Sequence, residues 1–204
     1  VSAAIVLFLA ALIYANLPTR LTIGHITPPL SHLKKAKLVK IEDEHSIDRE
    51  KAISGESFLS TPSLVVAVRR PLCILCRREA AHISTLKPLL NEAGIRLVAV
   101  TYQTKGVNRF KNDFDGDVYL DTKRTFYGPH ERWLPHWMGL LRFSLVLPLI
   151  ASIREGLGRA HDLRGEGRLL GGVFLMDGNE LVWSHLERYW GDKADVEEIK
   201  AAIR

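Results

Sequence analysis

The two cysteines of this chain, Cys73 and Cys76, are the residues whose type and spacing most directly suggest chemistry. They form a Cys-Ile-Leu-Cys motif, which can cycle between a dithiol and a disulfide. Four arginines bracket the pair: Arg69, Arg70, Arg77 and Arg78. Their positive charge favours the thiolate, which is the nucleophilic form of cysteine. The motif therefore predicts a redox site in which Cys73 is the nucleophile and Cys76 is the resolving thiol.

The predicted elements around the motif strengthen this interpretation. Ser63–Val68 (SLVVAV) is a near-continuous run rich in β-branched valine, as expected of a strand buried on both faces. Cys76–Glu92 has apolar residues at helical spacing, and Gly94 follows as a C-terminal cap. Cys73 therefore lies at a helix N-terminus, where unpaired N–H groups and the helix dipole favour a negative charge. Cys76 lies one turn further along, so it can reach back to Cys73.

Other interpretations of the cysteines need different partners. A structural zinc site needs four ligands, and the pair together with His82 supplies at most three, so we expect no metal. Two inert core cysteines remain an alternative. The arginines could also form a solvated patch. We expect no nucleic-acid binding, because no recognition-module pattern accompanies the basic residues.

The rest of the chain alternates strands and helices. Further strands are expected at Ile95–Tyr102, Val118–Leu120, Val173–Met176 and Leu181–Ser184, and helices at Thr104–Asn112 and Asp195–Ile203. Asp177-Gly178-Asn179 is a hairpin signal between the last two strands. This order predicts an α/β sandwich around a mixed sheet.

The N-terminal part of the chain has a different composition. Residues 1–17 carry no charge, which is typical of a membrane anchor, a signal-like segment or a buried helix. Basic residues follow with no acid until Glu42, so the positive-inside rule predicts a membrane-anchored protein whose remainder is cytoplasmic, with a secreted or organellar protein as the alternative. Residues 18–59 are expected to form a connector, and 60–204 the main domain.

A second apolar stretch, Trp133–Leu157, interrupts the domain. Arg142 and Pro148 make it a poor membrane span. It is expected to form a buried helical insertion over one sheet face. A lipid-facing surface or the wall of an apolar substrate pocket are the alternatives.

Composition limits the remaining function classes. The chain has 204 residues, a net charge of +5 and 47% hydrophobic residues, which excludes a disordered or collagen-like protein. Two cysteines exclude a disulfide-stapled secreted scaffold and fit one dithiol site in a reducing compartment. Residues 61–120 alone carry 9 basic and 5 acidic residues, so most of the excess charge lies in the segment that contains the thiols.

The segment Arg69–Ala80 (RRPLCILCRREA) resembles the signature of the peroxiredoxin-like 2 family of redox-regulatory proteins. Further matches follow in the family's order: Leu120-Asp121, Phe126-Tyr127-Gly128, Gly165-Glu166-Gly167, Gly171-Gly172-Val173-Phe174 and Gly191-Asp192. The resemblance covers roughly residues 56–204. It implies a thioredoxin-like fold and a thiol antioxidant, with Cys73 and Cys76 on the family's cysteine pair. It also implies no bound cofactor, with reducing equivalents from thioredoxin, glutathione or an NADPH-dependent system.

The sequence departs from better-known relatives at two points. Typical peroxiredoxins have a threonine three residues before the reactive cysteine, where this chain has Arg70. Thioredoxins have a cis-proline where this chain has Leu170-Gly171-Gly172. The hydroxyl that would position a peroxide is therefore absent, which argues against fast peroxidase chemistry. Reduction of protein disulfides stays open as an alternative that no motif supports.

Two further functions stay open beside the thiol antioxidant. The related prostamide/prostaglandin F synthases reduce a lipid endoperoxide, and the Trp133–Leu157 insertion could line such a pocket. A non-enzymatic, membrane-associated protein that binds its partner in one oxidation state is the second alternative.

Overall fold

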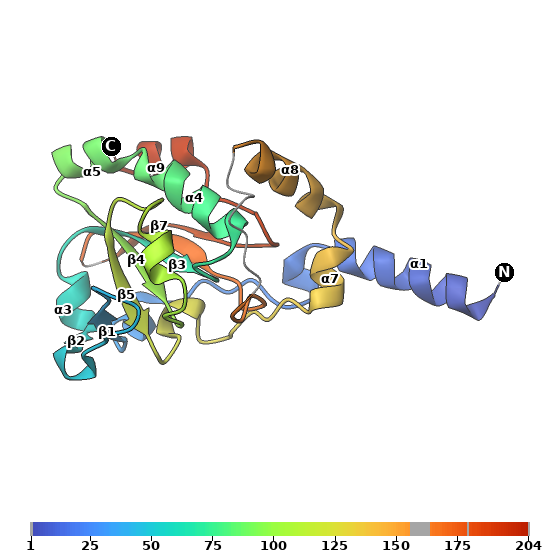
Figure 1. Cartoon of the computed structure of the whole chain (residues 1–204), viewed down its shortest axis with the longest axis horizontal. Coiled ribbons are helices and arrows are strands. Elements are labelled where there is room, and N and C mark those ends of the chain that lie inside the picture. The colour runs from blue at the N-terminus through green and yellow to red at the C-terminus, as the bar shows by residue number, and fades with distance from the viewer. Residues whose placement is uncertain (1, 156–163, 179, 204) are drawn as a thin grey trace.

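The computed structural model of the chain describes residues 2–155, 164–178 and 180–203. Within them, seven strands form one mixed sheet in the order β2-β1-β5-β4-β3-β6-β7 (Figure 1). The strands are β1 Lys37–Lys40, β2 Ile53–Ser54, β3 Ser63–Val68, β4 Arg96–Thr101, β5 Asp117–Asp121, β6 Gly172–Met176 and β7 Leu181–Leu186. β3, β4 and β5 run parallel, and the other pairs are antiparallel.

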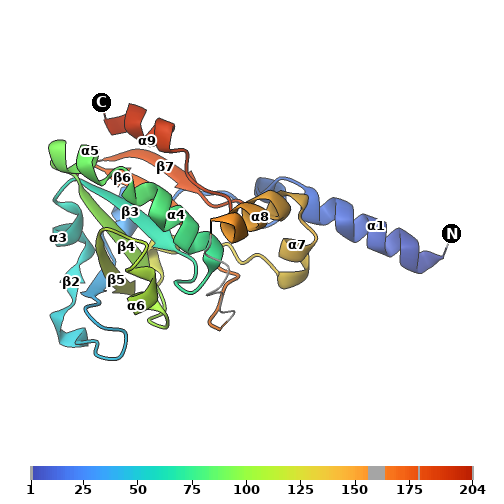
Figure 2. The same cartoon turned by 45° about the horizontal axis from the view of Figure 1, so that its top comes forward.

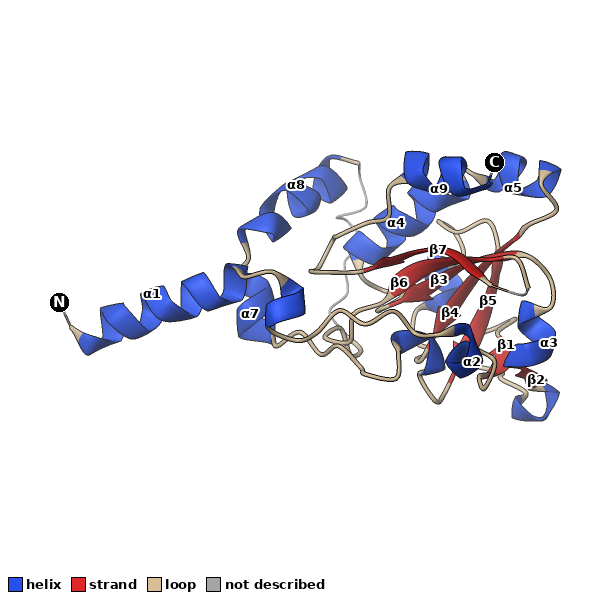
Figure 3. Cartoon of the chain, turned by 180° about the vertical axis from the view of Figure 1, so that it is seen from behind, coloured by secondary structure: helices blue, strands red, loops and turns tan. Residues whose placement is uncertain are grey.

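The described helices cover both faces of this sheet. The α-helices are α1 Ala3–Asn16, α2 Leu30–Leu33, α3 Gly55–Leu59, α4 Ile74–Ser84, α5 Lys87–Glu92, α6 Val107–Phe110, α7 His136–Leu140, α8 Val146–Arg154 and α9 Val196–Ile203. Short 3-10 turns lie at η1 Thr19–Leu21, η2 Arg49–Lys51, η3 Thr125–Tyr127 and η4 Phe143–Leu145. α4, α5 and α9 lie on one face, and α2 and α3 on the other (Figures 1 and 3). The predicted α/β sandwich is confirmed.

Strand β3 has the central position that its sequence predicts. Leu64 and Val66 pack into the core under α4, whereas Val65 and Ala67 pack into the core on the α3 side. Each fully buried aliphatic side chain of this kind contributes about 1.5–3 kcal/mol. Packing therefore fixes β3 on both faces. The loop that follows β3 places Arg69, Arg70 and the thiols at the edge of the sheet where this strand ends.

The helix expected over Cys76–Glu92 is two helices, α4 and α5. Pro88 lies in the first turn of α5, where its missing N–H costs nothing. In a continuous helix its ring would clash with the carbonyl of Ser84, which is the last residue of α4. Gly94 follows α5 with a φ of +68°, in agreement with the predicted cap.

The prediction that residues 18–59 form only a connector is wrong for residues 37–59. β1 pairs with β5 and β2 pairs with β1, so residues 37–54 extend the sheet. Phe58 of α3 is buried in the core on that side. A four-residue strand, Lys37–Lys40, has too short a pattern to be recognised without its partner β5.

The Trp133–Leu157 insertion is not the buried layer that its composition predicts. It forms α7, η4 and α8, and residues 156 and 157 lie outside the described residues. Several of its apolar side chains are well exposed: Trp137, Leu140, Phe143, Val146, Leu147 and Ile153. α8 lies beside the N-terminal end of α4 rather than on the sheet (Figure 2).

The apolar N-terminal segment forms α1, which projects from the end of the molecule where α7 and α8 lie (Figure 3). Among the described residues, no helix has both the length and the apolar character needed to cross a membrane.

Candidate active site

The thiol site lies at the edge of the sheet where β3 and β7 end. Ala67 of β3 is paired with Gly172 of β6, and Gly172 is paired with Leu186 of β7. The residues that follow β3 and β7 therefore leave the sheet at the same edge, on either side of the first residue of β6. This register brings Arg69 against Glu187, although 118 positions separate them in the sequence.

Cys73 is the N-cap residue of α4, as the sequence predicts. Its carbonyl accepts a hydrogen bond from the N–H of Arg77 at 3.0 Å, which is the first bond of the helix. Cys73 is 3% exposed and Cys76 is 9% exposed. Both are free thiols. The predicted arrangement, with one cysteine at the helix start and the other in its first turn, is what the structure contains.

Arg69 contacts the Cys73 sulfur directly. Its Nη2 donates to Cys73 Sγ at 3.3 Å, and its Nη1 donates to the carbonyl of Gly167 at 2.9 Å. Its Nε donates to Glu187 Oε1 at 3.2 Å, and the guanidinium lies 5.6 Å from the centre of the Trp190 ring. At 3% exposure, this cation is shielded from water. Its charge therefore acts on the sulfur with little screening.

The two thiols have opposite pKa shifts. The hydrogen bond from Cys76 holds the pKa of Cys73 well below its usual range, and Arg69 and Arg70 add to this effect against the cost of burial. The pKa of Cys76 is raised well above its usual range by the same hydrogen bond and by burial. These opposite shifts favour a thiolate at Cys73 and a protonated thiol at Cys76, while the roles of nucleophile and resolving thiol stay a prediction.

The four bracketing arginines do not act together. Arg69 and Arg70 precede the helix and face the thiols, and Arg70 is 8% exposed. Arg77 pairs instead with Asp113 after α6, and Arg78 pairs with Glu155 after α8 at 2.8 Å. Arg77 and Arg78 point away from the N-terminal end of α4, so the expectation that they stabilise the thiolate has no support in their contacts.

Glu187 is a site residue that sequence reasoning missed. Its Oε1 accepts from Arg69, and its Oε2 accepts from the N–H of Gly171 at 3.0 Å. It is buried, and burial raises its pKa. It follows a strand in a stretch with no motif, so only the register of β3, β6 and β7 could have identified it. Glu187 holds Arg69 in the orientation in which Nη2 reaches the sulfur.

Gly171 occupies the position where thioredoxins have a cis-proline. A side chain there would place Cβ 1.8 Å from the carbonyl oxygen of Ala67. Among the described residues, no peptide bond is cis. The backbone at Gly171 therefore lies against β3, and the Gly171 N–H donates to Glu187.

A cavity of about 400 Å³ opens beside Cys73. Its polar side is formed by Arg69 and Arg70, and its other residues are Cys73, Ile74, Leu75, His136, Leu140, Leu145, Leu149, Gly165, Gly167 and Trp190. None of these lining residues carries a hydroxyl group, in line with the absence of the peroxiredoxin threonine. Three of the leucines come from the insertion, so that segment forms the apolar wall considered as an alternative above.

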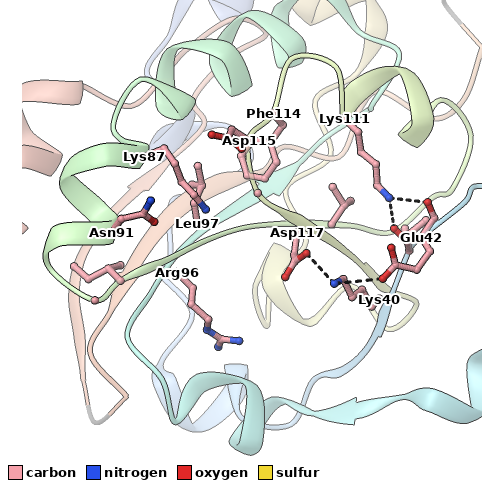
Figure 4. Close-up of a pocket in the computed structure, with 15 residues that line it drawn as sticks. Lys40, Glu42, Lys87, Asn91, Arg96, Leu97, Lys111, Phe114, Asp115 and Asp117 are labelled. Atoms are coloured by element: carbon pink, nitrogen blue, oxygen red, sulfur yellow. Dashed lines mark hydrogen bonds and ion pairs between the residues drawn. The ribbon is translucent and has the colours of Figure 1, made fainter.

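A larger cavity, of about 760 Å³, lies at the opposite edge of the sheet (Figure 4). Its Lys40 pairs with Asp117 at 3.0 Å and with Glu42 at 3.3 Å. Lys111 donates to the carbonyls of Ile41 and Glu42. The lining contains neither cysteine nor histidine, and these two lysines are already satisfied by the protein. Nothing in it parallels the thiol chemistry of the first cavity.

Comparison with known proteins agrees with the fold. A protein-family model described as AhpC/TSA antioxidant enzyme matches residues 82–189, which is over half of the chain and begins just beyond the two cysteines. Peroxiredoxin-like 2A of Danio rerio is 34% identical over 200 residues, covering 96% of this chain and 91% of that protein. The Homo sapiens protein of the same name is 33% identical, covering 86% of this chain and 79% of its own length.

A solved structure, peroxiredoxin Q of Xanthomonas campestris, superposes with a TM-score of 0.50 at 13% identity and covers 87% of this chain and 95% of that one. Fold and family model together define a thioredoxin-like protein of the AhpC/TSA antioxidant class. The full-length similarity to the curated relatives narrows this class, and the chain belongs to the peroxiredoxin-like 2 family. Membership supports a thiol-based redox role.

Proposed function

We propose that this protein is a thiol oxidoreductase that reduces peroxides, with Cys73 as the nucleophile and Cys76 as the resolving thiol. The observation that carries the proposal is the contact of Arg69 Nη2 with Cys73 Sγ at the floor of a cavity. A low-pKa thiolate that a small molecule can reach is the requirement for such chemistry.

The proposed reaction has two steps. The Cys73 thiolate attacks one oxygen of the hydroperoxide, the O–O bond breaks, and an alkoxide leaves and takes up a proton as the alcohol. Cys73 becomes a sulfenic acid. The Cys76 thiol then attacks that sulfur, a Cys73–Cys76 disulfide forms, and water leaves. A dithiol reductant such as thioredoxin, or glutathione, reduces the disulfide and completes the cycle.

Arg69 and Arg70 would take part in the first step beyond lowering the Cys73 pKa. Both guanidiniums face the cavity in which the peroxide must lie. Negative charge moves from the sulfur to the leaving oxygen during attack, and fixed donors beside that oxygen stabilise the transition state. In this way the two arginines would replace the missing threonine hydroxyl.

A turnover assay tests the proposal. Hydroperoxide loss is followed in the presence of thioredoxin, thioredoxin reductase and NADPH, with wild type, Cys73→Ser and Cys76→Ser. We expect Cys73→Ser to abolish turnover and Cys76→Ser to consume at most one equivalent of peroxide. Equal turnover in wild type and Cys73→Ser would contradict the proposal.

A lipid endoperoxide is the second candidate substrate, because Leu140, Leu145 and Leu149 make one wall of the cavity apolar. The Cys73 thiolate would attack one endoperoxide oxygen, so that an S–O bond forms, the O–O bond breaks and the freed alkoxide takes up a proton. The Cys76 thiol would then attack the Cys73 sulfur, the S–O bond would break, the second oxygen would leave as a hydroxyl with the thiol proton, and the disulfide would form. Prostaglandin H serves as the test substrate. The endoperoxide alternative predicts that Leu145→Ser slows its turnover more than that of hydrogen peroxide, and equal slowing of both would contradict it.

A further inference from the structure

An apolar surface at the α1 end of the molecule has no partner within the described structure. It combines exposed side chains of α1, α7, η4 and α8, which lie at one end of the molecule, and we call it the apolar platform (Figures 1 and 3). Its most exposed members lie between 57% and 77% exposed and are Leu7, Phe8, Ile13, Leu140, Phe143, Leu147 and Ile153. Apolar surfaces of this extent mark interaction sites.

Specific contacts fix the orientation of α1 within the platform. Arg142 donates from Nε to the carbonyl of Ala15 at 2.6 Å and also to the carbonyl of Leu17, so it caps the C-terminus of α1. The side chain of Asn16 bonds the carbonyl of Leu141 at 2.9 Å and the N–H of Phe143 at 3.0 Å. The platform is therefore one connected surface.

The shape and charge of the platform favour a lipid surface as its occupant. Five consecutive residues of α1, positions 5 to 9, are exposed apolar side chains, which cover more than one full turn. A protein groove covers one stripe of a helix, whereas lipid can surround all sides. Tyr14 and Trp137 stack at the foot of α1 with ring centres 6.2 Å apart, and such rings are enriched at membrane–water interfaces.

The charges beside the platform are mainly basic in the sequence, and Glu155, the acid that follows α8, is paired with Arg78. No acidic residue occurs before Glu42 or between Glu131 and Glu155. Arg20 and Arg154 are exposed close to the ends of α1 and α8. Basic side chains beside an apolar surface complement anionic lipid headgroups.

We propose that the apolar platform binds the surface of a bilayer that contains anionic lipid, with α1, α7 and α8 entering the boundary between headgroups and acyl chains. Leu140 and Leu149 belong both to the platform and to the lining of the thiol cavity. Binding would therefore bring the cavity to the lipid surface. On the proposed peroxide reductase function, this favours oxidised acyl chains as the substrate class.

Vesicle co-sedimentation of the full chain tests the binding without any thiol reaction, so it can fail or succeed independently of the proposed catalysis. The probes are phosphatidylcholine vesicles with and without phosphatidylserine. The variants are Phe143→Glu with Leu147→Glu, and the matched control is Val182→Glu, an exposed apolar residue on β7 outside the platform. All these positions are exposed, so the variants should fold, and circular dichroism checks this.

We expect wild type and Val182→Glu to sediment with the anionic vesicles. The double variant should bind at least about tenfold more weakly, because each apolar side chain of this size gains well over one factor of ten on transfer from water. Failure of wild type to sediment, or equal sedimentation of the double variant, would overturn the proposal. So would self-association of wild type without vesicle binding, lost in the double variant, because a second copy would then be the occupant.

Discussion

Replacement of Arg69 by methionine removes a buried guanidinium that donates a hydrogen bond to the Cys73 sulfur. A hydrogen bond to a charged group contributes about 1.5–3 kcal/mol, which corresponds to a factor of about 10–150 in the equilibrium between thiolate and thiol. We therefore expect the acid dissociation constant of the Cys73 thiol to fall by that factor, which raises its pKa. The direction follows from the sign of the charge, since a lost cation disfavours the anion.

The assay is the alkylation rate of Cys73 by iodoacetamide over a range of pH, in a Cys76→Ser background so that one thiol reacts. The midpoint of the rate profile should move to higher pH in Arg69→Met. The plateau rate should not fall, because a more basic thiolate is intrinsically more nucleophilic. The profile therefore separates a pKa effect from a blocked cavity, which would lower the plateau and leave the midpoint unchanged.

Two further variants control this experiment. Arg69→Met leaves Glu187 buried without its cation, so the double variant with Glu187→Gln removes both charges and protects the fold. Arg78→Met removes a cation that lies on α4 but pairs with Glu155. An equal shift of the midpoint in Arg78→Met, or no shift in Arg69→Met and in the double variant, would refute the assignment of Arg69.

Two other predictions concern groups near the site, the partly buried carboxyl of Glu79 and the glycine Gly171. Burial raises the pKa of Glu79 to about 8 from a usual value of 4.5, so the folded state binds its proton more tightly and loses stability as pH rises from about 4.5 to 8. The free energy of unfolding of Glu79→Gln, measured with urea, should equal that of wild type near pH 4 and exceed it by about 1–3 kcal/mol at pH 9. The control is Glu92→Gln at an exposed position, whose difference from wild type should not change with pH. A difference between Glu79→Gln and wild type that is the same at all pH values would refute the effect. Gly171→Ala should lower the free energy of unfolding by about 2–3 kcal/mol, because its Cβ would clash with the carbonyl oxygen of Ala67. It should also slow Cys73 alkylation, because the clash would displace the Gly171 N–H that holds Glu187. A free energy of unfolding within about 0.5 kcal/mol of wild type would contradict the close approach.

The parts of the fold that the sequence predicts are those with strong local patterns. Leu64–Val68 is apolar throughout, as expected of a strand like β3 that is buried on both faces, and Asp177-Gly178 predicts the hairpin of β6 and β7. The position of Cys73 at a helix start follows from the same local patterns. These features need no knowledge of distant contacts.

The features that the sequence does not predict depend on distant partners. Lys37–Lys40 becomes a strand only because β5 offers an open edge to it. Glu187 reaches Arg69 only through the register of three strands. Apolar composition is the same for a buried layer and for an exposed surface, so the insertion could not be placed by pattern alone. Closeness in sequence also overestimates how many arginines act on the thiols. Arg77 pairs with Asp113 after α6, and Arg78 pairs with Glu155 after α8.

The central claim is that Cys73 is the thiol that peroxide oxidises first. Its most direct test treats wild type, Cys73→Ser and Cys76→Ser with one equivalent of hydroperoxide in the presence of dimedone, followed by peptide mass spectrometry. We predict a Cys73–Cys76 disulfide in wild type, a dimedone adduct on Cys73 in Cys76→Ser, and an unmodified Cys76 in Cys73→Ser. A dimedone adduct that forms on Cys76 in Cys73→Ser as fast as on Cys73 in Cys76→Ser would contradict the claim.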